Sequence, residues 1–263
     1  MKTIAGLPTD GRRIARIRQA LVGWIYPPLC AACEAPLTAA RQIEVPFLCE
    51  PCEAALTPIG DYYCRVCGQG FDGTSALPSR CGNCGDRELA IDFAVSAFRG
   101  AGAGKGLVHR FKYAKERHLA RLFGVLLDEV WRDERLREPG SWWVVPVPLH
   151  RKRQRERGFN QSLELARELV RRAPAGIDLT LRPLLRRTRE KERQARLDRR
   201  DRLANLGDVF APARRHPEVP PGGARLLLVD DVITTGTTVS ECAAVLREVM
   251  EIDQIAAVSV LRG

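Results

Sequence analysis

The chain has 263 residues, of which 45% are hydrophobic, so it is long enough for one large domain or two smaller ones with a sizeable core. Its formal net charge is +10, from 42 Lys and Arg residues against 32 Asp and Glu residues. No stretch approaches the roughly 20 apolar residues of a membrane-spanning helix. Residues 11–26 also lack the apolar run and cleavage site of a secretion signal, so we expect a cytoplasmic protein.

The positive charge is confined to two segments. Residues 150–157 hold five basic residues and one acidic residue, and residues 182–202 hold ten basic and four acidic residues. Together they account for the whole excess, so the rest of the chain is neutral on balance. This distribution favours anion-binding loops over a generally basic surface, although a charge run is often only a solvated surface.

The N-terminal region predicts a helix, because Ile14, Ile17, Leu21 and Trp24 lie at helical spacing. We expect this apolar face to pack on the core of the protein. The alternative is a helix that lies on the membrane surface, which would place the protein at the periphery of the inner face of the membrane.

Eight of the nine cysteines form four C-x-x-C pairs. Each pair places two thiolates on one tight turn, and two such turns complete a tetrahedral zinc site. Fifteen residues separate the first two pairs and 13 separate the last two, near the spacing of zinc ribbons. We expect two structural Zn²⁺ ions bound by pairs taken in sequence order, although interleaved pairing fits the spacing too. The predicted ligands are Cys30, Cys33, Cys49, Cys52, Cys64, Cys67, Cys81 and Cys84.

Other uses of these cysteines fit less well. A disulfide framework does not suit an intracellular chain, a redox dithiol does not explain four pairs, and the regular pairing favours zinc over an iron–sulfur cluster. Gly68 and Gly85 each follow a pair directly, where we expect a turn with positive φ. Cys242 stands apart on an apolar helical face, and we expect it to be a buried core residue.

From residue 91 the pattern becomes that of an α/β domain, so we place the domains at residues 1–88 and 89–263. Residues 91–98 predict a strand, and helices are expected near residues 105–113 and 116–137. Lys112 lies at the end of the first helix, where we expect a solvated side chain, with a phosphate contact as the alternative. Residues 142–147 predict a second buried strand, which Pro146 and Pro148 bring to an end.

A cationic loop is predicted after this strand and before a helix that ends near residue 172. Arginine suits phosphate because its planar guanidinium group makes paired, charge-assisted hydrogen bonds. A strand is expected at residues 179–185. Residues 186–203 are too polar to bury and predict a mobile loop or a ligand-facing helix, and residues 204–210 are expected to return to the sheet. The cationic loop supplies Arg151, Arg153 and Arg157 as candidate anion ligands.

Residues 225–241, RLLLVDDVITTGTTVSE, have the pattern of a buried strand, a loop and a helix. Asp230 and Asp231 come at the carboxyl end of the strand, where ligands bind in open α/β sheets. The loop precedes a helix N-terminus, whose free N–H groups and dipole attract an anion, and Gly236 permits close approach. We therefore expect a ribose-5-phosphate site, with a simple N-cap as the alternative. The phosphate would contact Thr234, Thr235, Gly236, Thr237 and Thr238.

This stretch resembles the PRPP-binding signature of type I phosphoribosyltransferases. With the four C-x-x-C pairs and the segments PVPLHRKRQRERGFNQ (residues 146–161) and RQARLDRRDRLANLGDVF (residues 193–210), the chain after about residue 20 resembles the ComF/GntX family. That family joins a double zinc ribbon to a phosphoribosyltransferase domain and is associated with DNA uptake and natural transformation. The resemblance implies an α/β fold, with a type I phosphoribosyltransferase-like parallel sheet flanked by helices and an N-terminal double zinc-ribbon module.

The resemblance also implies a ligand and a reaction. PRPP would bind together with Mg²⁺. The pyrophosphate would lie against Val147, Pro148 and the arginines that follow them, and residues 188–203 would close over the site. An enzyme would transfer the phosphoribosyl group to an acceptor and release pyrophosphate, with Asp230 or Asp231 stabilising an oxocarbenium-like ribose. The alternative is a non-catalytic adaptor that binds single-stranded DNA or senses PRPP and works with DNA-uptake proteins. Phe159 is the one aromatic residue of the basic loops that could stack on a base.

Overall fold

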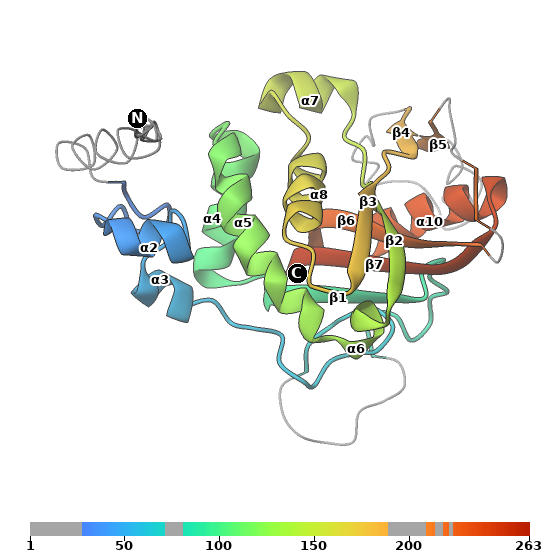
Figure 1. Ribbon diagram of the computed structural model, residues 1–263, viewed down its shortest axis with the longest axis horizontal. Coiled ribbons are helices and arrows are strands. Elements are labelled where there is room, and N and C mark those ends of the chain that lie inside the picture. The colour runs from blue at the N-terminus through green and yellow to red at the C-terminus, as the bar shows by residue number, and fades with distance from the viewer. Residues whose placement is uncertain (1–27, 72–80, 189–208, 214–217, 221–222) are drawn as a thin grey trace, which may run out of the picture. The chain divides into compact units, whose positions relative to one another are not determined.

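The computed structural model describes residues 28–71, 81–188, 209–213, 218–220 and 223–263 (Figure 1). The predicted helix at residues 14–24 and nearly all of the predicted closing segment, residues 188–203, lie outside the described residues. The chain divides into two compact units, residues 1–53 and residues 54–263, which we call the ribbon unit and the sheet unit. The second pair of cysteine turns therefore belongs to the same compact unit as the sheet.

The ribbon unit is built around two short helices, α2 (Ala39–Glu44) and α3 (Glu50–Ala54), the second of which ends just past the unit boundary. Thr38 caps α2, because its hydroxyl oxygen accepts a hydrogen bond from the backbone N–H of Arg41. The Arg41 side chain donates to the carbonyl oxygen of Leu48 at 2.8 Å and pairs with Glu53. One side chain thus ties α2 to the turn that precedes α3.

The sheet unit contains a five-stranded parallel sheet with the order β1-β7-β6-β2-β3. The α/β fold with a parallel sheet is confirmed. The central strand β6 has neighbours on both sides and is buried from residue 226 to residue 229, as its unbroken apolar run predicts. The strands are β1 (Phe93–Arg99), β2 (Gly140–Pro146), β3 (Ile177–Leu181), β6 (Ala224–Ile233) and β7 (Ile252–Arg262).

Helices pack on this sheet from the connections between the strands (Figure 1). Helix α8 lies against β2, β3, β6 and α5, and α10 lies against β6 and β7. Leu226 and Leu228 meet Cys242 and Leu246 of α10 in one core cluster, so the predicted burial of Cys242 is confirmed. The helices of the unit are α4 (Gly102–Tyr113), α5 (Ala120–Leu127), α6 (Glu134–Arg137), α7 (Arg151–Arg157), α8 (Gln161–Arg171) and α10 (Thr237–Val249).

Several sequence-based expectations about the elements are wrong. The helix expected at residues 116–137 is broken into α5, two 3₁₀ turns and α6, and Asp133 caps the last piece by accepting the N–H of Arg135. The strand expected at residues 179–185 is split at Pro183, which has no N–H for a strand ladder. Its second half, β4 (Leu185–Arg187), pairs with β5 (Phe210–Pro212) in a separate antiparallel sheet, so Phe210 does not return to the main sheet.

Candidate functional site

The predicted phosphate loop joins the central strand β6 to helix α10. Thr234, Thr235 and Gly236 form the turn, and Thr237 and Thr238 begin the helix. Gly236 has a φ of +79° and occupies the N-cap position, which explains why a glycine stands there. The first N–H groups of α10 have no acceptor within the helix and face the turn. We call residues 234–238 the anion loop.

A small pocket opens at the anion loop, and the lining comes from one continuous stretch of chain. The loop supplies hydroxyl groups, and the end of β6 supplies one carboxylate, Asp230. The hydroxyl oxygens of Thr235 and Thr237 lie 2.9 Å apart, so the loop presents a connected set of donors. The lining residues are Asp230, Val232, Ile233, Thr234, Thr235, Gly236, Thr237, Thr238 and Val239.

The two adjacent aspartates have different surroundings, because successive side chains of a strand point to opposite faces of the sheet. Asp230 lines the pocket, and its Oδ1 accepts hydrogen bonds of 2.9 Å from the Ser162 hydroxyl and from the N–H of Asp231. Asp231 is 6% exposed, and its Oδ1 lies 2.8 Å from Nζ of Lys112 on α4. Only one of the two predicted ribose ligands therefore faces the pocket.

Asp230 has an unusual protonation equilibrium. Burial raises the pKa of its carboxyl group, the charge of Asp231 raises it further, and the opposing effects of Lys112 and Ser162 leave the pKa at about 7. The group therefore changes charge near neutral pH. A bound cation, or a ligand that donates hydrogen bonds, would stabilise its ionised form.

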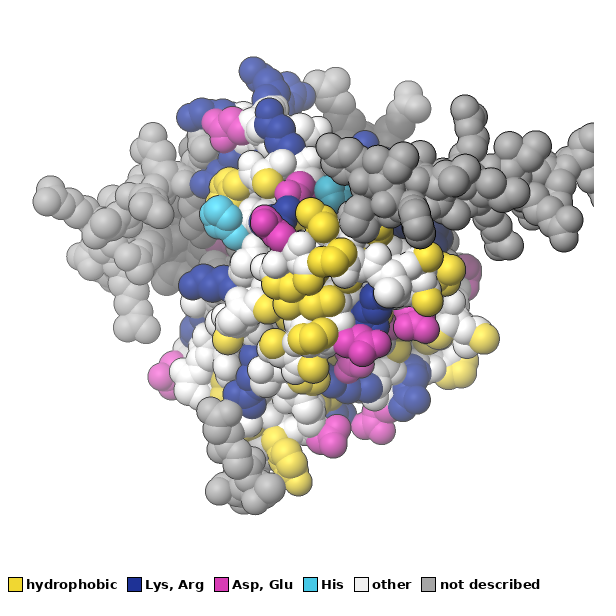
Figure 2. Space-filling model, turned by 90° about the vertical axis from the view of Figure 1, so that its left-hand side faces the viewer, with side chains coloured by type: hydrophobic (Ala, Val, Ile, Leu, Met, Phe, Trp, Pro, Cys, Tyr) yellow, Lys and Arg dark blue, Asp and Glu magenta, His cyan; other side chains and the backbone are white. Residues whose placement is uncertain are grey.

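The predicted cationic loop is a helix, α7, so that expectation is wrong. His150 caps it by accepting the N–H of Lys152, and Gly158, with a φ of +83°, ends it. Arg151 is exposed and Arg153 is half-buried. Figure 2 shows Lys and Arg side chains projecting at the top of the molecule, where α7 lies in Figure 1.

The third predicted arginine of α7 is engaged with its neighbours. Arg157 donates to Oε1 of Gln161 at 2.9 Å, and its guanidinium lies 5.0 Å from the ring centroid of Tyr113. The loop before α7 is held in place by Asn160, whose amide donates to the carbonyl oxygen of Val147. The three arginines therefore do not form one uniform cationic surface.

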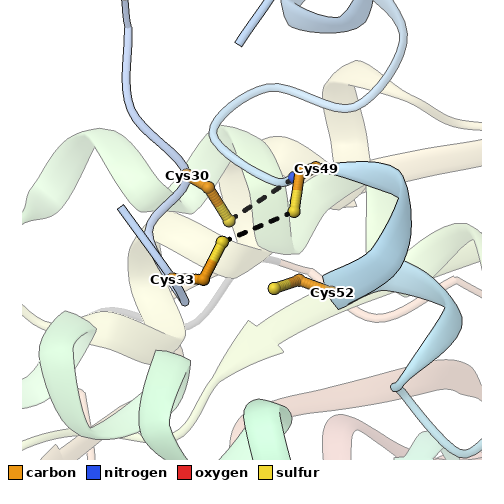
Figure 3. A group of neighbouring side chains, drawn as sticks. All are labelled: Cys30, Cys33, Cys49 and Cys52. Carbon is orange, nitrogen blue, oxygen red and sulfur yellow. Dashed lines mark hydrogen bonds between the residues drawn. The ribbon is translucent and has the colours of Figure 1, made fainter. Parts of the chain in front are cut away.

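The first four cysteines come together in the ribbon unit (Figure 3). Their sulfur atoms all lie within 4.8 Å of one another. The sulfur of Cys30 also accepts the N–H groups of Ala32 and Cys49, and hydrogen bonds of this kind stabilise a thiolate. The members of this first cluster are Cys30, Cys33, Cys49 and Cys52.

The second cluster lies in the sheet unit and consists of Cys64, Cys67, Cys81 and Cys84. Burial opposes ionisation of Cys67, but hydrogen bonds from Asn83 and Arg262 lower the pKa of its thiol to about 6. Four sulfur donors at these separations suit Zn²⁺. Pairing in sequence order is confirmed. Gly68 has the expected positive φ of +71°, whereas Gly85 is not among the glycines with positive φ.

Comparisons with known proteins agree with this arrangement. The double zinc ribbon domain family matches residues 21–85. Competence protein F of Haemophilus influenzae is 33% identical over 191 residues, which cover 71% of this chain and 79% of that protein. DNA utilization protein YhgH of Escherichia coli strain K12 is 33% identical over 225 residues, which cover 84% and 91% of the two chains. The chain belongs to the ComF/GntX family. Competence protein ComFC of Bacillus subtilis strain 168 is 24% identical over 258 residues, or 92% of this chain and 98% of that protein.

The surroundings of two basic residues near the site were not predicted from the sequence. Lys112 is 22% exposed and paired with Asp231, so the expectation of a solvated lysine is wrong. Arg187 on β4 was not predicted. Burial and the charge of Arg153 lower its pKa, while Asp230 is close enough to oppose that shift. The sequence gives no signal that separates Arg187 from the other arginines of its basic segment.

Among the described residues, no helix is both long enough and apolar enough to cross a bilayer.

Proposed function

We propose that this protein binds PRPP, or a related ribose phosphate, at the anion loop. The observation that supports the proposal is one pocket that combines Asp230 with a hydroxyl-rich turn at the N-terminus of α10. In this proposal, the loop N–H groups and threonine hydroxyls donate to the 5′-phosphate, and the ribose hydroxyls donate to Asp230. Asp231 has an indirect part, because its carboxylate pairs with Lys112 and holds α4 to the same strand.

The proposal includes Mg²⁺ with the ligand, as part of this same inference. Mg²⁺ prefers oxygen ligands, which the carboxylate of Asp230 and the oxygens of a pyrophosphate both supply. When bound, the ion would neutralise charge on the leaving group. The part of this chain is to hold a carboxyl group whose pKa of about 7 lets it ionise readily beside a cation.

Phosphoribosyl transfer is the reaction that such a site would serve. The bond between C1 of the ribose and the pyrophosphate oxygen would break, and an acceptor would bond to C1. The charges of Asp230 and Arg153 both act on Arg187, so in this proposal the two arginines supply the positive charge that stabilises the departing pyrophosphate. A PRPP sensor would use the same contacts without turnover. Incubation with PRPP and candidate acceptors distinguishes the two uses, because only transfer releases pyrophosphate in step with acceptor consumption.

Substitution of the two aspartates tests the ligand assignment. The double variant Asp230→Asn, Asp231→Asn should show no PRPP binding by calorimetry with Mg²⁺, because the ribose ligand and the charge that anchors Lys112 are both removed. Asp178→Asn is the control, since Asp178 is exposed and lies near the amino end of β3, away from the carboxyl ends of the strands. Unchanged affinity in the double variant contradicts a ribose site at these residues.

Single-stranded DNA binding is a second candidate function, which we propose because of one exposed aromatic residue. Tyr113 is 61% exposed, lies beside the guanidinium of Arg157, and has the ring of His109 at 4.8 Å. Phe159, the expected stacking residue, is 7% exposed and packs on Phe111, so it cannot stack on a base. The relatives named for competence and DNA utilization also support this candidate.

A nucleic-acid binding assay tests this second candidate. Tyr113→Ala should weaken binding of a short single-stranded oligonucleotide by about fivefold or more, since stacking on one base contributes about 1–3 kcal/mol. Combined substitution of Arg151, Arg153 and Arg157 by Ala should reduce the salt dependence of binding. Tyr62→Ala is the matched control, because Tyr62 is 45% exposed and lies outside α4 and α7. Equal losses in the two tyrosine variants contradict a stacking role for Tyr113.

A further inference from the structure

We propose that the second zinc ribbon positions the anion loop, so that Zn²⁺ bound by Cys64, Cys67, Cys81 and Cys84 supports the ligand site directly. Two arginines, Arg87 and Arg262, make the connection. The identity of the ligand rests on the proposed function, whereas the coupling between the ribbon and the loop does not.

Arg262, near the end of β7, is the first connection. It is 3% exposed, and its guanidinium reaches two distant parts of the chain at once. Toward the ribbon, Nε donates to the carbonyl oxygen of Cys67 at 3.1 Å and Nη2 lies 3.6 Å from the Cys67 sulfur. Toward the loop, Nη1 donates to the carbonyl oxygen of Ile233 at 2.9 Å and also contacts that of Thr234. One rigid, planar group thus fixes the exit of β6 relative to a metal ligand.

The charge of Arg262 explains why the metal matters for this contact. In the described part of the chain, the recorded partners of Arg262 are backbone carbonyl oxygens and the Cys67 sulfur. A buried guanidinium is costly unless an anion balances it. Four thiolates around one Zn²⁺ carry a net charge of about −2. The zinc–thiolate cluster would therefore place negative charge beside Arg262, and its loss would remove that charge from the arginine.

Arg87 is the second connection and comes directly after the last cysteine turn. Its N–H donates to the carbonyl oxygen of Cys84, so its backbone belongs to the turn that holds the metal. Its side chain crosses to the anion loop, where Nη1 donates to the carbonyl oxygen of Thr235 at 3.0 Å and Nη2 donates to the Thr237 hydroxyl at 2.6 Å. The Thr237 oxygen accepts from Arg87, so its own proton can be donated to the Thr235 hydroxyl or to a phosphate oxygen.

The residues after Arg87 continue the same contact along the start of α10. The side chain of Leu89 lies beside Gly236, at 3.6 Å from the position that a Cβ would occupy. The N–H of Ala90 donates to the Ser240 hydroxyl at 2.9 Å. The turn and the first turn of α10 are therefore held on one side by residues 87–90 and at the end of β6 by Arg262. A preorganised set of donors binds an anion more tightly than a loose one.

Hydrogen exchange of the loop tests this coupling without any ligand. Arg87→Ala and Arg262→Lys should each speed exchange of the amides of residues 240–243 by about tenfold or more, because these are the first amides of α10 with acceptors in the helix and local opening of the loop exposes them. Arg65→Ala is the matched control. Arg65 lies inside the same ribbon, but its side chain contacts Tyr63 and Glu134 and not the loop. Unchanged exchange in both test variants, with full zinc content, overturns the proposal.

Stepwise removal of zinc provides the second measurement. Exchange at residues 240–243 should accelerate in step with release of zinc from the second cluster. A Cys30→Ser, Cys33→Ser variant, which removes only the first site, should keep the wild-type exchange of the loop. Acceleration that follows loss of the first zinc instead overturns the proposal. A wild-type protein that shows zinc-dependent loop protection but no PRPP binding supports the coupling and refutes the proposed ligand.

Discussion

The two cysteine clusters have the same composition but different surroundings. In the first cluster Cys33 is exposed and two other cysteines are partly exposed, whereas all four cysteines of the second cluster are buried. The first belongs to the ribbon unit, and the second is built into the unit that holds the sheet. Two zinc ribbons that the sequence presents as a matched pair therefore have different structural roles.

The second ribbon is joined to the sheet by contacts beyond those at the anion loop. The N–H of Ala94 on β1 donates to the carbonyl oxygen of Val66, which lies between two metal ligands. The Tyr63 hydroxyl donates to the buried carboxylate of Asp133 at 2.6 Å, and Arg135 holds that carboxylate from the other side. Burial raises the pKa of the Tyr63 hydroxyl, and its hydrogen bond to Asp133 raises the pKa further. The second ribbon forms a buried cluster of its own, which hydrogen bonds join to the sheet.

Removal of the metal ligands should show the largest difference between the ribbons. Cys64→Ser with Cys67→Ser should lower the unfolding temperature of the sheet unit by about 10 °C or more, because metal binding contributes folding free energy there. Cys30→Ser with Cys33→Ser should leave that transition within about 2 °C of wild type. Calorimetry with metal analysis checks both, with about two Zn²⁺ in the wild type and about one in each variant. Equal losses of stability contradict the distinction between the ribbons.

A smaller effect is expected at the glycine that lets the second ribbon approach β1. Gly68 has a φ of +71°, and an added Cβ would lie 2.7 Å from the carbonyl oxygen of Ala94. Gly60 has a similar φ of +74°, but a Cβ there would meet nothing within 4 Å. Gly60→Ala should cost about 1–2 kcal/mol from the backbone conformation alone. Gly68→Ala should cost about 1–3 kcal/mol more, because it adds a steric overlap.

Urea denaturation of the two glycine variants measures this difference. If Gly68→Ala costs no more than Gly60→Ala, the ribbon is free to move away from β1 and is not packed as a core element. A fall in zinc content confined to Gly68→Ala would sharpen the comparison further, since it would link the packing contact to the metal site.

A change of pH should affect the sheet unit through Asp230. Below about pH 4 this carboxyl is protonated in both the folded and the unfolded chain, and between about pH 4 and pH 7 the proton is retained mainly in the folded chain. The free energy of unfolding of the sheet unit therefore falls as the pH rises through that window. Asp230→Asn removes the dependence and should stabilise the sheet unit at pH 8 by about 1–3 kcal/mol, with little effect at pH 4.

Asp231→Asn is the matched control for this measurement and should act in the opposite direction. It leaves Lys112 partly buried without its carboxylate, which should destabilise the unit by about 1–3 kcal/mol at pH 8. The pH profile of the ribbon unit should not change in either variant. Stabilisation by both substitutions contradicts the different surroundings of the two aspartates.

Sequence patterns predicted the features that depend on local spacing. The strands β1, β2, β6 and β7, the burial of Cys242 and the grouping of the cysteines follow from periodicity and from pairs of ligands separated by two residues. The helix α7 also had local signals, a capping His150 and a terminal Gly158, which the run of positive charge obscured. These signals act within a few residues, so they can be recognised in a single sequence.

The connections at the site could not be predicted in this way. The ion pair between Lys112 and Asp231 joins α4 to β6, which are far apart in the sequence. Arg262 likewise lies 195 residues from Cys67. Nothing near these residues specifies the partner, because the fold alone brings them together. The different surroundings of Asp230 and Asp231 follow from strand alternation, but the identity of each neighbour depends on where α4 and α8 pack.

The position of β7 has a consequence for how the protein acquires its fold. This strand, the last in the sequence, lies between β1 and β6, and Ser259 bonds to Ser96 across the β1 interface. Neither neighbour of β7 can complete its ladder until residues 252–262 have been synthesised. Arg262 comes with the same segment. A nascent chain on the ribosome would therefore leave the edge of β1 unpaired and the second metal centre incompletely supported until β7 emerges.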